Sequence, residues 1–301
     1  MRLEGTYTAL ITPFDKEGKI DEQTLVKLIQ RQLHAGIDGI VFLGSTGEGS
    51  CIEEHERDLV TQIAVHELKG KIPVLINCGS PSTKRTVAFA RQAEKMGADA
   101  LLVTSPYYNR PTQEGLFLHF KAISDAVRIP ICVYNIPCRT AQNVETATLS
   151  RIAELPNVIS VKESSANLSQ MADVVEKIAH KHPKFTVLSG DDQFTLPLMA
   201  IGGHGVVSVL SNLVPHAVKR LVSNAQEGNF DLARAIYYAL KPLIHGAFIE
   251  TNPIPIKLLM QFAGLCAATY RLPLCPASQE NETKLLHLYQ ACNHLITDYE
   301  T

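Results

Sequence analysis

Short apolar segments recur along the chain at an interval of roughly thirty residues, the size of one βα unit, and this spacing limits the possible folds more than any other feature. Amphipathic segments lie between them, such as Glu22–His34 and Thr83–Met96, the latter between an N-capping Ser82 and Gly97. Apolar strands that alternate with helices indicate a parallel sheet, and eight units predict an α/β protein with a closed (β/α)8 TIM barrel. The predicted strands are Thr8–Ile11, Gly39–Leu43, Val74–Asn77, Ala100–Val103, Ile131–Tyr134, Val158–Lys162, Thr186–Ser189 and Val206–Val209.

The strand pattern stops after Ser223, and the rest of the chain reads as helical. Three segments have helical periodicity, with prolines at the joints between them. We therefore divide the chain into a catalytic barrel, residues 1–225, and a C-terminal helical domain, residues 226–301. The three predicted helices are Phe230–Ile244, Ile254–Phe262 and Glu280–Ile296.

The composition excludes several classes of protein. Lysine and arginine number 28 against 30 aspartates and glutamates, a net charge of −2, so nucleic acid or a membrane is not the expected partner. The seven cysteines form no C-x-x-C pair and the histidines no H-E-x-x-H motif, so we predict neither a disulfide framework nor a bound metal or cofactor. Without a long apolar run or a signal-like start, we expect a soluble, cytoplasmic protein.

Lys162 ends a short run of apolar, β-branched residues. Side chains alternate along a strand, so we expect Val158, Ser160 and Lys162 on one face, and Ile159 and Val161 on the face packed against helices. Lys162 would then point into the barrel, where loss of hydration favours its neutral, nucleophilic form. Such an amine can form a Schiff base with a carbonyl compound. The alternative is a solvated charge that merely marks the strand end.

Polar side chains follow the other strands at the end where barrel active sites lie. Ser45 and Thr46 lie in a glycine-rich loop suited to a carboxylate or phosphate, although such loops also occur as ordinary turns. Tyr134 would project into the barrel mouth beside Lys162 and relay protons, and Arg139 beyond it could bind a carboxylate. The alternatives are core packing for the tyrosine and a surface ion pair for the arginine.

Two further loops carry weaker signals. Asp191 and Asp192 could bind a metal or cap the next helix, and we favour capping because no other ligands cluster with them. The glycines of Gly202–Gly205 resemble a phosphate loop but could equally form the pocket wall. His204 would lie at the start of the eighth strand, the wrong end of a barrel for catalysis, and is predicted to be structural.

These motifs together resemble the pyruvate-dependent class I lyase and aldolase family, over nearly the whole chain. The motifs that carry the resemblance are Thr12-Pro13-Phe14, Gly44–Glu48, Pro106–Pro111, Tyr134–Thr140, Val161-Lys162-Glu163, Gly190-Asp191-Asp192, Gly202–Gly205 and Asn252–Lys257.

The resemblance implies a role for each of several residues. Lys162 would form an imine with pyruvate, whose carboxylate the loop with Ser45 and Thr46 would receive. Tyr134 would be the acid and base, in a proton relay with the Ser45 hydroxyl and with Tyr108 from an adjacent subunit. Family members are commonly homotetramers built from tight dimers, so we expect a homo-oligomer.

The resemblance implies roles for three more residues, one of which bears on the choice between branches of the family. Gly190 and Val207 would offer backbone contacts, and Arg139 would bind the carboxylate of aspartate 4-semialdehyde. This arginine and the Asn252–Lys257 motif favour the synthase branch, which makes 4-hydroxy-tetrahydrodipicolinate for lysine and diaminopimelate biosynthesis. Ser45 replaces a threonine usual in that branch and also occurs in sialic acid lyases. The alternatives are therefore an N-acetylneuraminate lyase-like or 2-keto-3-deoxy sugar acid aldolase, or a keto-acid binder without turnover.

Feedback by lysine is expected to be weak or absent. Lysine-inhibited members of the family bind lysine at a dimer interface with a tyrosine, histidines, an asparagine and a glutamate. Here Tyr107 is retained, but the other positions hold Glu54, Arg57, Pro81 and Arg85. An arginine in place of the glutamate reverses the charge that would pair the lysine ammonium. Half-inhibition of the purified enzyme at submillimolar lysine would contradict this prediction.

Overall fold

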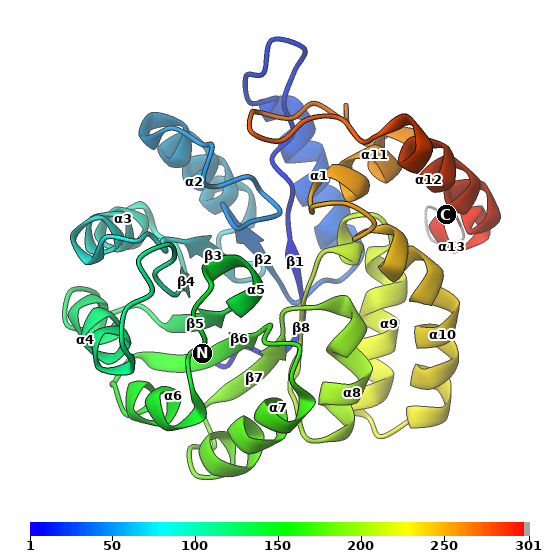
Figure 1. The fold of residues 1–301 in the computed structure, drawn as a ribbon. Coiled ribbons are helices and arrows are strands. Elements are labelled where there is room, and N and C mark those ends of the chain that lie inside the picture. Colours follow the sequence, from blue (N-terminus) through cyan, green and yellow to red (C-terminus); the bar gives the residue numbers. More distant parts are fainter. Residues whose placement is uncertain (298–301) are drawn as a thin grey trace.

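Eight parallel strands close into one barrel in the computed structural model, which describes residues 1–297 (Figure 1). Each strand pairs with the next along the chain, and the last pairs with the first. The fold is therefore the predicted TIM barrel. The strands are β1 (Gly5–Ala9), β2 (Gly39–Phe42), β3 (Val74–Asn77), β4 (Ala100–Thr104), β5 (Ile131–Asn135), β6 (Val158–Glu163), β7 (Thr186–Ser189) and β8 (Gly205–Ser208).

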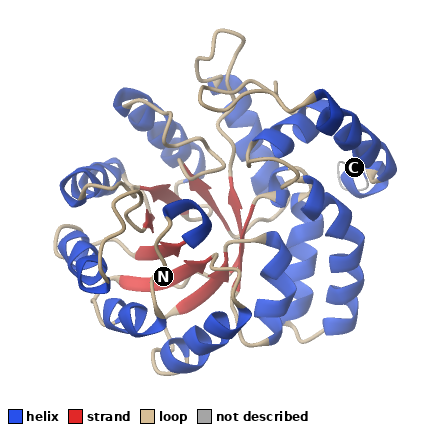
Figure 2. Cartoon of the chain, in the orientation of Figure 1, coloured by secondary structure: helices blue, strands red, loops and turns tan. Residues whose placement is uncertain are grey.

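Helices surround the barrel (Figure 2). The ring is made by α1 (Glu22–His34), α2 (Glu54–Leu68), α3 (Thr83–Met96), α4 (Gln113–Ser124), α6 (Thr146–Ala153), α7 (Leu168–Val174) with a π-helical extension (Val175–Ala179), α8 (Thr195–Ala200) and α9 (Pro215–Gln226). The short α5 (Pro137–Thr140) and 3-10 turns at Asp192–Phe194 and Leu210–Asn212 follow β5, β7 and β8. The predicted caps of α3 are present: Ser82 accepts a hydrogen bond from the Arg85 backbone, and Gly97 is left-handed at φ 94°.

The first strand begins three residues earlier than its apolar pattern predicts. Seven of the predicted strands agree with the structure within one residue at each end, but Thr8–Ile11 is wrong. The error arises because the residues that the prediction left out, Gly5, Thr6 and Tyr7, are buried without forming an aliphatic run. The Thr8 hydroxyl donates to Gln32 Oε1 and accepts from Ser211 Oγ, both at 2.8 Å. Hydrogen-bonded in this way, a threonine can be buried without the apolar character by which a strand is recognised.

The C-terminal region is helical, as predicted. It contains α10 (Phe230–Gly246), α11 (Ile254–Phe262), α12 (Gln279–Ala291) and α13 (Asn293–Thr297). The predicted helix Glu280–Ile296 is two helices that break at Cys292. Helix α10 packs along α9, and α12 packs on α11 (Figure 1). The domain boundary near residue 225 stays a prediction, and the last four residues of the predicted second domain lie outside the described residues. None of the helices within residues 1–297 has the length and apolar character needed to cross a bilayer.

Apolar side chains form two layers, one inside the barrel and one between the barrel and the helices. Neighbouring residues of a strand alternate between them: Val41, Leu102 and Tyr134 belong to the inner cluster, whereas Ile40 and Leu101 belong to the outer core. This alternation is the period of two that a pleated strand imposes. The barrel interior is therefore a packed core, and any site must lie where that core ends, at the mouth.

One β-bulge interrupts the alternation in β6. Ile131 of β5 is the register partner of Val158, but the next residue, Cys132, is the partner of Ser160. Ile159 is thus the extra residue. Val158 belongs to the outer core, whereas Ile159 packs against the inner cluster. A bulge of this kind re-aims the side chains that follow it.

The bulge corrects the predicted faces of β6. Val158 does not share a face with Lys162, and Ile159 does not share one with Val161. The inward direction of Lys162 was nevertheless predicted correctly, because Val161 packs in the outer core and Lys162 is the register partner of Tyr134. Without the extra residue, regular alternation from Val158 would have turned the lysine outward.

Candidate active site

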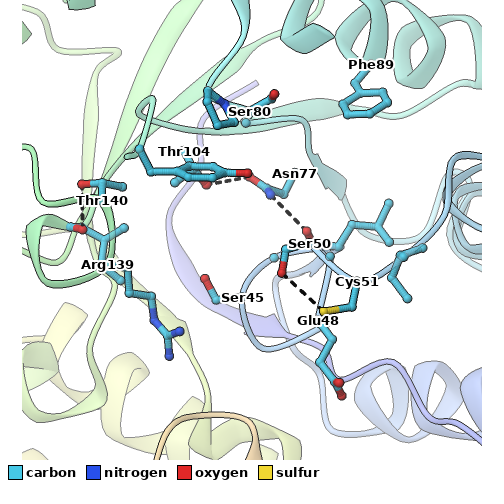
Figure 3. A pocket seen from close by; sticks show the side chains of 18 of the residues that line it. Ser45, Glu48, Ser50, Cys51, Asn77, Ser80, Phe89, Thr104, Arg139 and Thr140 are labelled. Carbon is cyan, nitrogen blue, oxygen red and sulfur yellow. Dashed lines mark hydrogen bonds between the residues drawn. The ribbon is translucent and has the colours of Figure 1, made fainter. Parts of the chain in front are cut away.

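A cleft of about 460 Å³ opens at the C-terminal end of the barrel, beside β2, β3, β4 and β5 (Figure 3). Its walls come from the segments after these strands and from the C-terminal region. Its lining includes Ser45, Ile136, Arg139 and Asn252. In Figure 3 the side chains of Ser45 and Arg139 face the same open space from the loop after β2 and from α5. The position is the one at which barrels of this kind hold their ligands.

Lys162 and Tyr134 lie just inside the barrel next to this cleft. They are register partners on β6 and β5, and both are buried, with 5% and 3% of their surfaces exposed. The side-chain nitrogen of Lys162 lies 4.1 Å from the centroid of the Tyr134 ring. Ile136 packs with Tyr134 in the inner cluster and also lines the cleft, so the two regions adjoin. A buried amine in contact with a phenol is a suitable arrangement for imine chemistry.

Gly190 leaves the space that the Lys162 side chain occupies. A Cβ atom at this position would lie 2.9 Å from Cε of Lys162 and 1.9 Å from Oγ of Ser164, so any other residue here would have to displace both side chains. The Ser164 hydroxyl is buried and has no hydrogen-bond partner within residues 1–297. Val207 of β8 belongs to the same inner cluster as Tyr134. The lysine is thus enclosed by the backbone after β7 and by an unpartnered hydroxyl.

Asn252 connects two of the predicted substrate-binding residues. The side-chain NH2 group of Asn252 donates a hydrogen bond to Thr46 Oγ1 at 3.0 Å. Its backbone carbonyl oxygen accepts a hydrogen bond from the Arg139 guanidinium at 3.1 Å. Its Oδ1 atom is buried with no partner in the described part of the chain. The loop after β2 is held on its other side by Thr12, whose hydroxyl donates to the Gly47 carbonyl at 2.7 Å. Thr46 and Arg139 are therefore oriented by one residue of the C-terminal region.

A buried ion pair joins the loop after β2 to helix α11. Lys257 of α11 pairs with Glu48, and both side chains have no exposed surface. The Lys257 ammonium also donates to the Thr269 carbonyl at 2.9 Å and lies 4.2 Å from the Phe14 ring centroid. The second Glu48 oxygen accepts from the Arg271 backbone at 3.3 Å. Because the loss of either partner would leave an unpaired buried charge, costing about 3–5 kcal/mol, α11 and the loop are strongly coupled.

Asp191 and Asp192 have structural contacts. Asp191 caps the 3-10 turn after β7, where its side chain accepts from the Gln193 backbone, so the predicted capping role is confirmed. Asp192 is buried and accepts from the Ser208 hydroxyl and from two backbone N–H groups after β8. Burial raises the pKa of Asp192 to about 6. Within residues 1–297 no group of three His, Cys, Asp or Glu side chains is arranged to hold a metal.

His204 has the structural role expected of it. It lies just before β8, at the opposite end of the barrel from the cleft, and its Nδ1 atom accepts a hydrogen bond from the Val187 backbone at 3.1 Å. Burial lowers the pKa of its ring.

A model of the dihydrodipicolinate synthetase family matches residues 2–292. The chain belongs to the dihydrodipicolinate synthetase family. It is 51% identical over 288 residues, 96% of each chain, to the 4-hydroxy-tetrahydrodipicolinate synthase of Protochlamydia amoebophila, and 45% identical over 282 residues to that of Endomicrobium trichonymphae, covering 93% of this chain and 95% of that one. The crystal structure of dihydrodipicolinate synthase from Aquifex aeolicus superposes with a TM-score of 0.94 at 40% identity, covering 98% of this chain and all of that one.

The residues predicted from the family resemblance surround one mouth, with a single exception. Ser45 and Arg139 line the cleft, Thr46 is joined to its wall by Asn252, and Lys162 lies beneath it with the other members of the predicted set, Tyr134, Gly190 and Val207. Tyr108 is the exception: 87% of its surface is exposed, and its backbone is left-handed at φ 74°. Within its own subunit this side chain lies in solvent.

Sequence reasoning did not assign roles to Asn252, Lys257 or Ser164. The signal for Lys257 was present, since it is the single charged residue of α11, a helix that is otherwise almost wholly apolar. Asn252 begins the motif that carried the family resemblance, but nothing in its spacing connects it to Thr46, 206 residues away. Ser164 gave no signal, because its neighbour Gly190 is close only in the folded barrel.

We predict that Gly190→Ala slows the reaction of Lys162 with a keto acid. The added methyl group would displace the Lys162 and Ser164 side chains, and a misplacement of about 1 Å at a reacting group costs about a hundredfold in rate. The measurement is the rate of imine formation with pyruvate, beside a matched Gly115→Ala control at the start of α4. Unchanged kinetics in a folded Gly190→Ala protein would contradict the role of this glycine.

Proposed function

We propose that this chain condenses pyruvate with L-aspartate 4-semialdehyde to give 4-hydroxy-tetrahydrodipicolinate, as a lyase of lysine and diaminopimelate biosynthesis. The observation that supports the chemistry best is the buried Lys162 amine against the Tyr134 ring, at the mouth of a barrel of this family. The relatives named above are 4-hydroxy-tetrahydrodipicolinate synthases, which supports the choice of substrates.

The first half of the reaction takes place on Lys162. Its amine attacks the ketone carbon of pyruvate, and loss of water from the carbinolamine leaves an imine. Tyr134, whose ring contacts the lysine, supplies the proton to the departing hydroxyl in this proposal. The hydroxyls of Ser45 and Thr46 receive the pyruvate carboxylate, and Asn252 keeps the Thr46 hydroxyl in place. No cofactor is required, because the protonated imine itself withdraws electrons from the methyl carbon.

The second half joins the two substrates. Loss of a methyl proton converts the imine into an enamine, whose terminal carbon attacks the aldehyde of aspartate 4-semialdehyde while the aldehyde oxygen takes up a proton. Arg139 binds the carboxylate of this substrate; its guanidinium faces the cleft and is oriented by its hydrogen bond to the Asn252 carbonyl. The amino group of the substrate then closes on the imine carbon and releases Lys162.

Tyr108 completes the proton relay from an adjacent subunit in this proposal. A large aromatic side chain that is 87% exposed, on a strained left-handed backbone, is a costly feature for an isolated chain. Insertion into a neighbouring subunit would bury it. We therefore propose a homo-oligomer, a tetramer built from dimers, in which each site needs two chains.

We also propose a cytoplasmic location. All seven cysteines are free thiols, which supports a reducing compartment such as the cytoplasm.

The competing aldolase reaction is favoured by one observation, the serine at position 45. We expect the purified protein to condense pyruvate with aspartate 4-semialdehyde, and Lys162→Arg to lose at least about a thousandfold in activity because its guanidinium cannot form the imine. Cleavage of N-acetylneuraminate should be absent or far slower. Faster cleavage than condensation would assign the chain to the lyase branch, and an active Lys162→Arg variant would refute the mechanism.

Subunit complementation tests the role of Tyr108. Tyr108→Phe and Lys162→Arg should each be nearly inactive alone, because every site of either homo-oligomer lacks one group. Co-expression should restore activity, since a hybrid contains sites with Lys162 from one chain and Tyr108 from the other. Each hybrid pair has one intact site, so about half of the wild-type rate per pair is the upper limit. Absence of any gain, with mixed oligomers verified by mass spectrometry, would place Tyr108 outside the shared site.

A further inference from the structure

Glu163 is a buried carboxylate beside Lys162 that the proposed mechanism does not use. Its side chain has no exposed surface. Neighbouring residues of a strand face opposite sides, and Lys162 faces the barrel interior, so Glu163 faces the surrounding helices. Its register partner on β5 is Asn135, the residue after Tyr134. Glu163 and Asn135 thus lie directly behind the two residues on which imine formation is proposed to depend.

The hydrogen bonds to this carboxylate within residues 1–297 all come from neutral donors. Oε1 accepts from the Ser165 backbone at 2.7 Å, and Oε2 accepts from the side-chain NH2 groups of Asn135, at 3.0 Å, and Gln170, at 3.4 Å. With donors on both oxygens, the site fits the ionised form, which is an acceptor only. Burial raises the pKa of Glu163, and the hydrogen bonds from Asn135 and Ser165 act to lower it. A charge buried among neutral groups costs free energy, so an apolar residue would serve a purely stabilising role better.

The amide side chains around the carboxylate are held in one orientation. Asn135 Oδ1 accepts from the Val144 backbone at 2.9 Å, so its NH2 group must face Glu163 and Asn143 Oδ1. Gln170 Oε1 accepts from the Asn143 NH2 group at 2.8 Å, which turns the Gln170 NH2 group toward Glu163. Because each amide uses its oxygen elsewhere, none can be reversed alone to meet a changed group at position 163.

The backbone of Glu163 connects the strand ends around Lys162. Its carbonyl oxygen accepts from the Gly190 N–H at 2.9 Å, and the N–H of the next residue, Ser164, donates to the Asn135 carbonyl at 2.8 Å. Gly190 is the residue whose missing side chain leaves room for the lysine. A displacement of Glu163 would therefore be passed to β5, to the segment after β7 and to Lys162 itself.

We propose that Glu163 is a positioning residue for imine formation, whose carboxylate holds the ends of β5 and β6 so that Lys162 is set against Tyr134. The inference rests on the proposed function, because it concerns the reaction of Lys162 with pyruvate. An amide at position 163 has the same shape but places an NH2 group where an oxygen now accepts, so two donors would face each other. The strand ends must move to separate them, and a misplacement of about 1 Å at a reacting group costs about a hundredfold in rate.

Rapid-quench borohydride trapping at a series of pyruvate concentrations tests this role, with adducts on Lys162 counted by mass spectrometry. We expect Glu163→Gln to lower the rate of imine formation at saturating pyruvate about tenfold or more. The pyruvate concentration for half-maximal rate should stay within about threefold of the wild-type value, because Ser45 and Thr46 lie in the loop after β2. Rates are compared below the unfolding temperature of every variant, where a residue that only stabilised the fold would leave them unchanged.

An exchange of the carboxylate and the amide between positions 163 and 170 provides a rescue. Gln170→Glu alone places two carboxylates against each other, so it should also slow imine formation. In the double variant Glu163→Gln/Gln170→Glu, the amide at position 163 still accepts from the Ser165 backbone and donates to the carboxylate at position 170. The double variant should therefore react faster than either single variant.

Glu94→Gln is the matched control. Glu94 of α3 also accepts from backbone N–H groups, those of Arg128 at 2.7 Å and Ile129 at 3.1 Å, but it lies at the opposite end of the barrel from Lys162. Its replacement should leave the rate of imine formation unchanged.

The outcomes separate this inference from the proposed function. An unchanged saturating rate in folded Glu163→Gln, an equal fall in Glu94→Gln, or a double variant no faster than the single variants would overturn the role of Glu163 and leave the proposed function standing. A wild-type protein that forms no adduct with pyruvate would refute the proposed function, and the role of Glu163 with it.

Discussion

The register between β5 and β6 is the constraint on which the proposed site depends. One extra residue at Ile159 shifts the pairing so that Lys162 faces Tyr134 inside the barrel. A shift of one residue in a strand moves every later side chain to the opposite face. With regular alternation from Val158, the amine would have been directed at the surrounding helices. The bulge therefore places a lysine where a strand of this sequence would otherwise place an apolar residue.

The C-terminal helices hold the other half of the site. Lys257 and Glu48 form a fully buried ion pair between α11 and the loop after β2, while Asn252 joins Thr46 to Arg139. A buried pair contributes little net stability compared with apolar residues, because both charges are desolvated. The ion pair instead fixes the position of the loop relative to α11, because separating the two residues would leave an unpaired charge buried in the core. The predicted substrate-binding residues after β2 and β5 are thus kept in one arrangement by Asn252, which lies 206 positions after Thr46 and 113 positions after Arg139.

The fold followed from the spacing of apolar segments, because eight βα units allow few arrangements other than a closed barrel. The residues near the mouth followed from the rule that parallel strands deliver their C-terminal ends to one edge. The predictions were wrong or incomplete where the local structure depends on contacts between residues that are distant in the sequence. Thr8 of β1 is buried through hydrogen bonds to Gln32 and Ser211. The bulge in β6 cannot be recognised from the sequence, because it lies within an uninterrupted run of mostly β-branched residues. Asn252 could not be placed for the same reason, since its partners are distant in sequence.

Borohydride trapping in the presence of pyruvate tests the central claim most directly. Reduction of the imine makes the adduct permanent, and mass analysis of the digested protein identifies the modified residue. Lys257 is an internal control, because it is also buried but is paired with Glu48. The account predicts a single pyruvate-dependent adduct, on the peptide that contains Lys162, and none on Lys257. An adduct on any other residue, or the absence of an adduct from a folded protein, would contradict it.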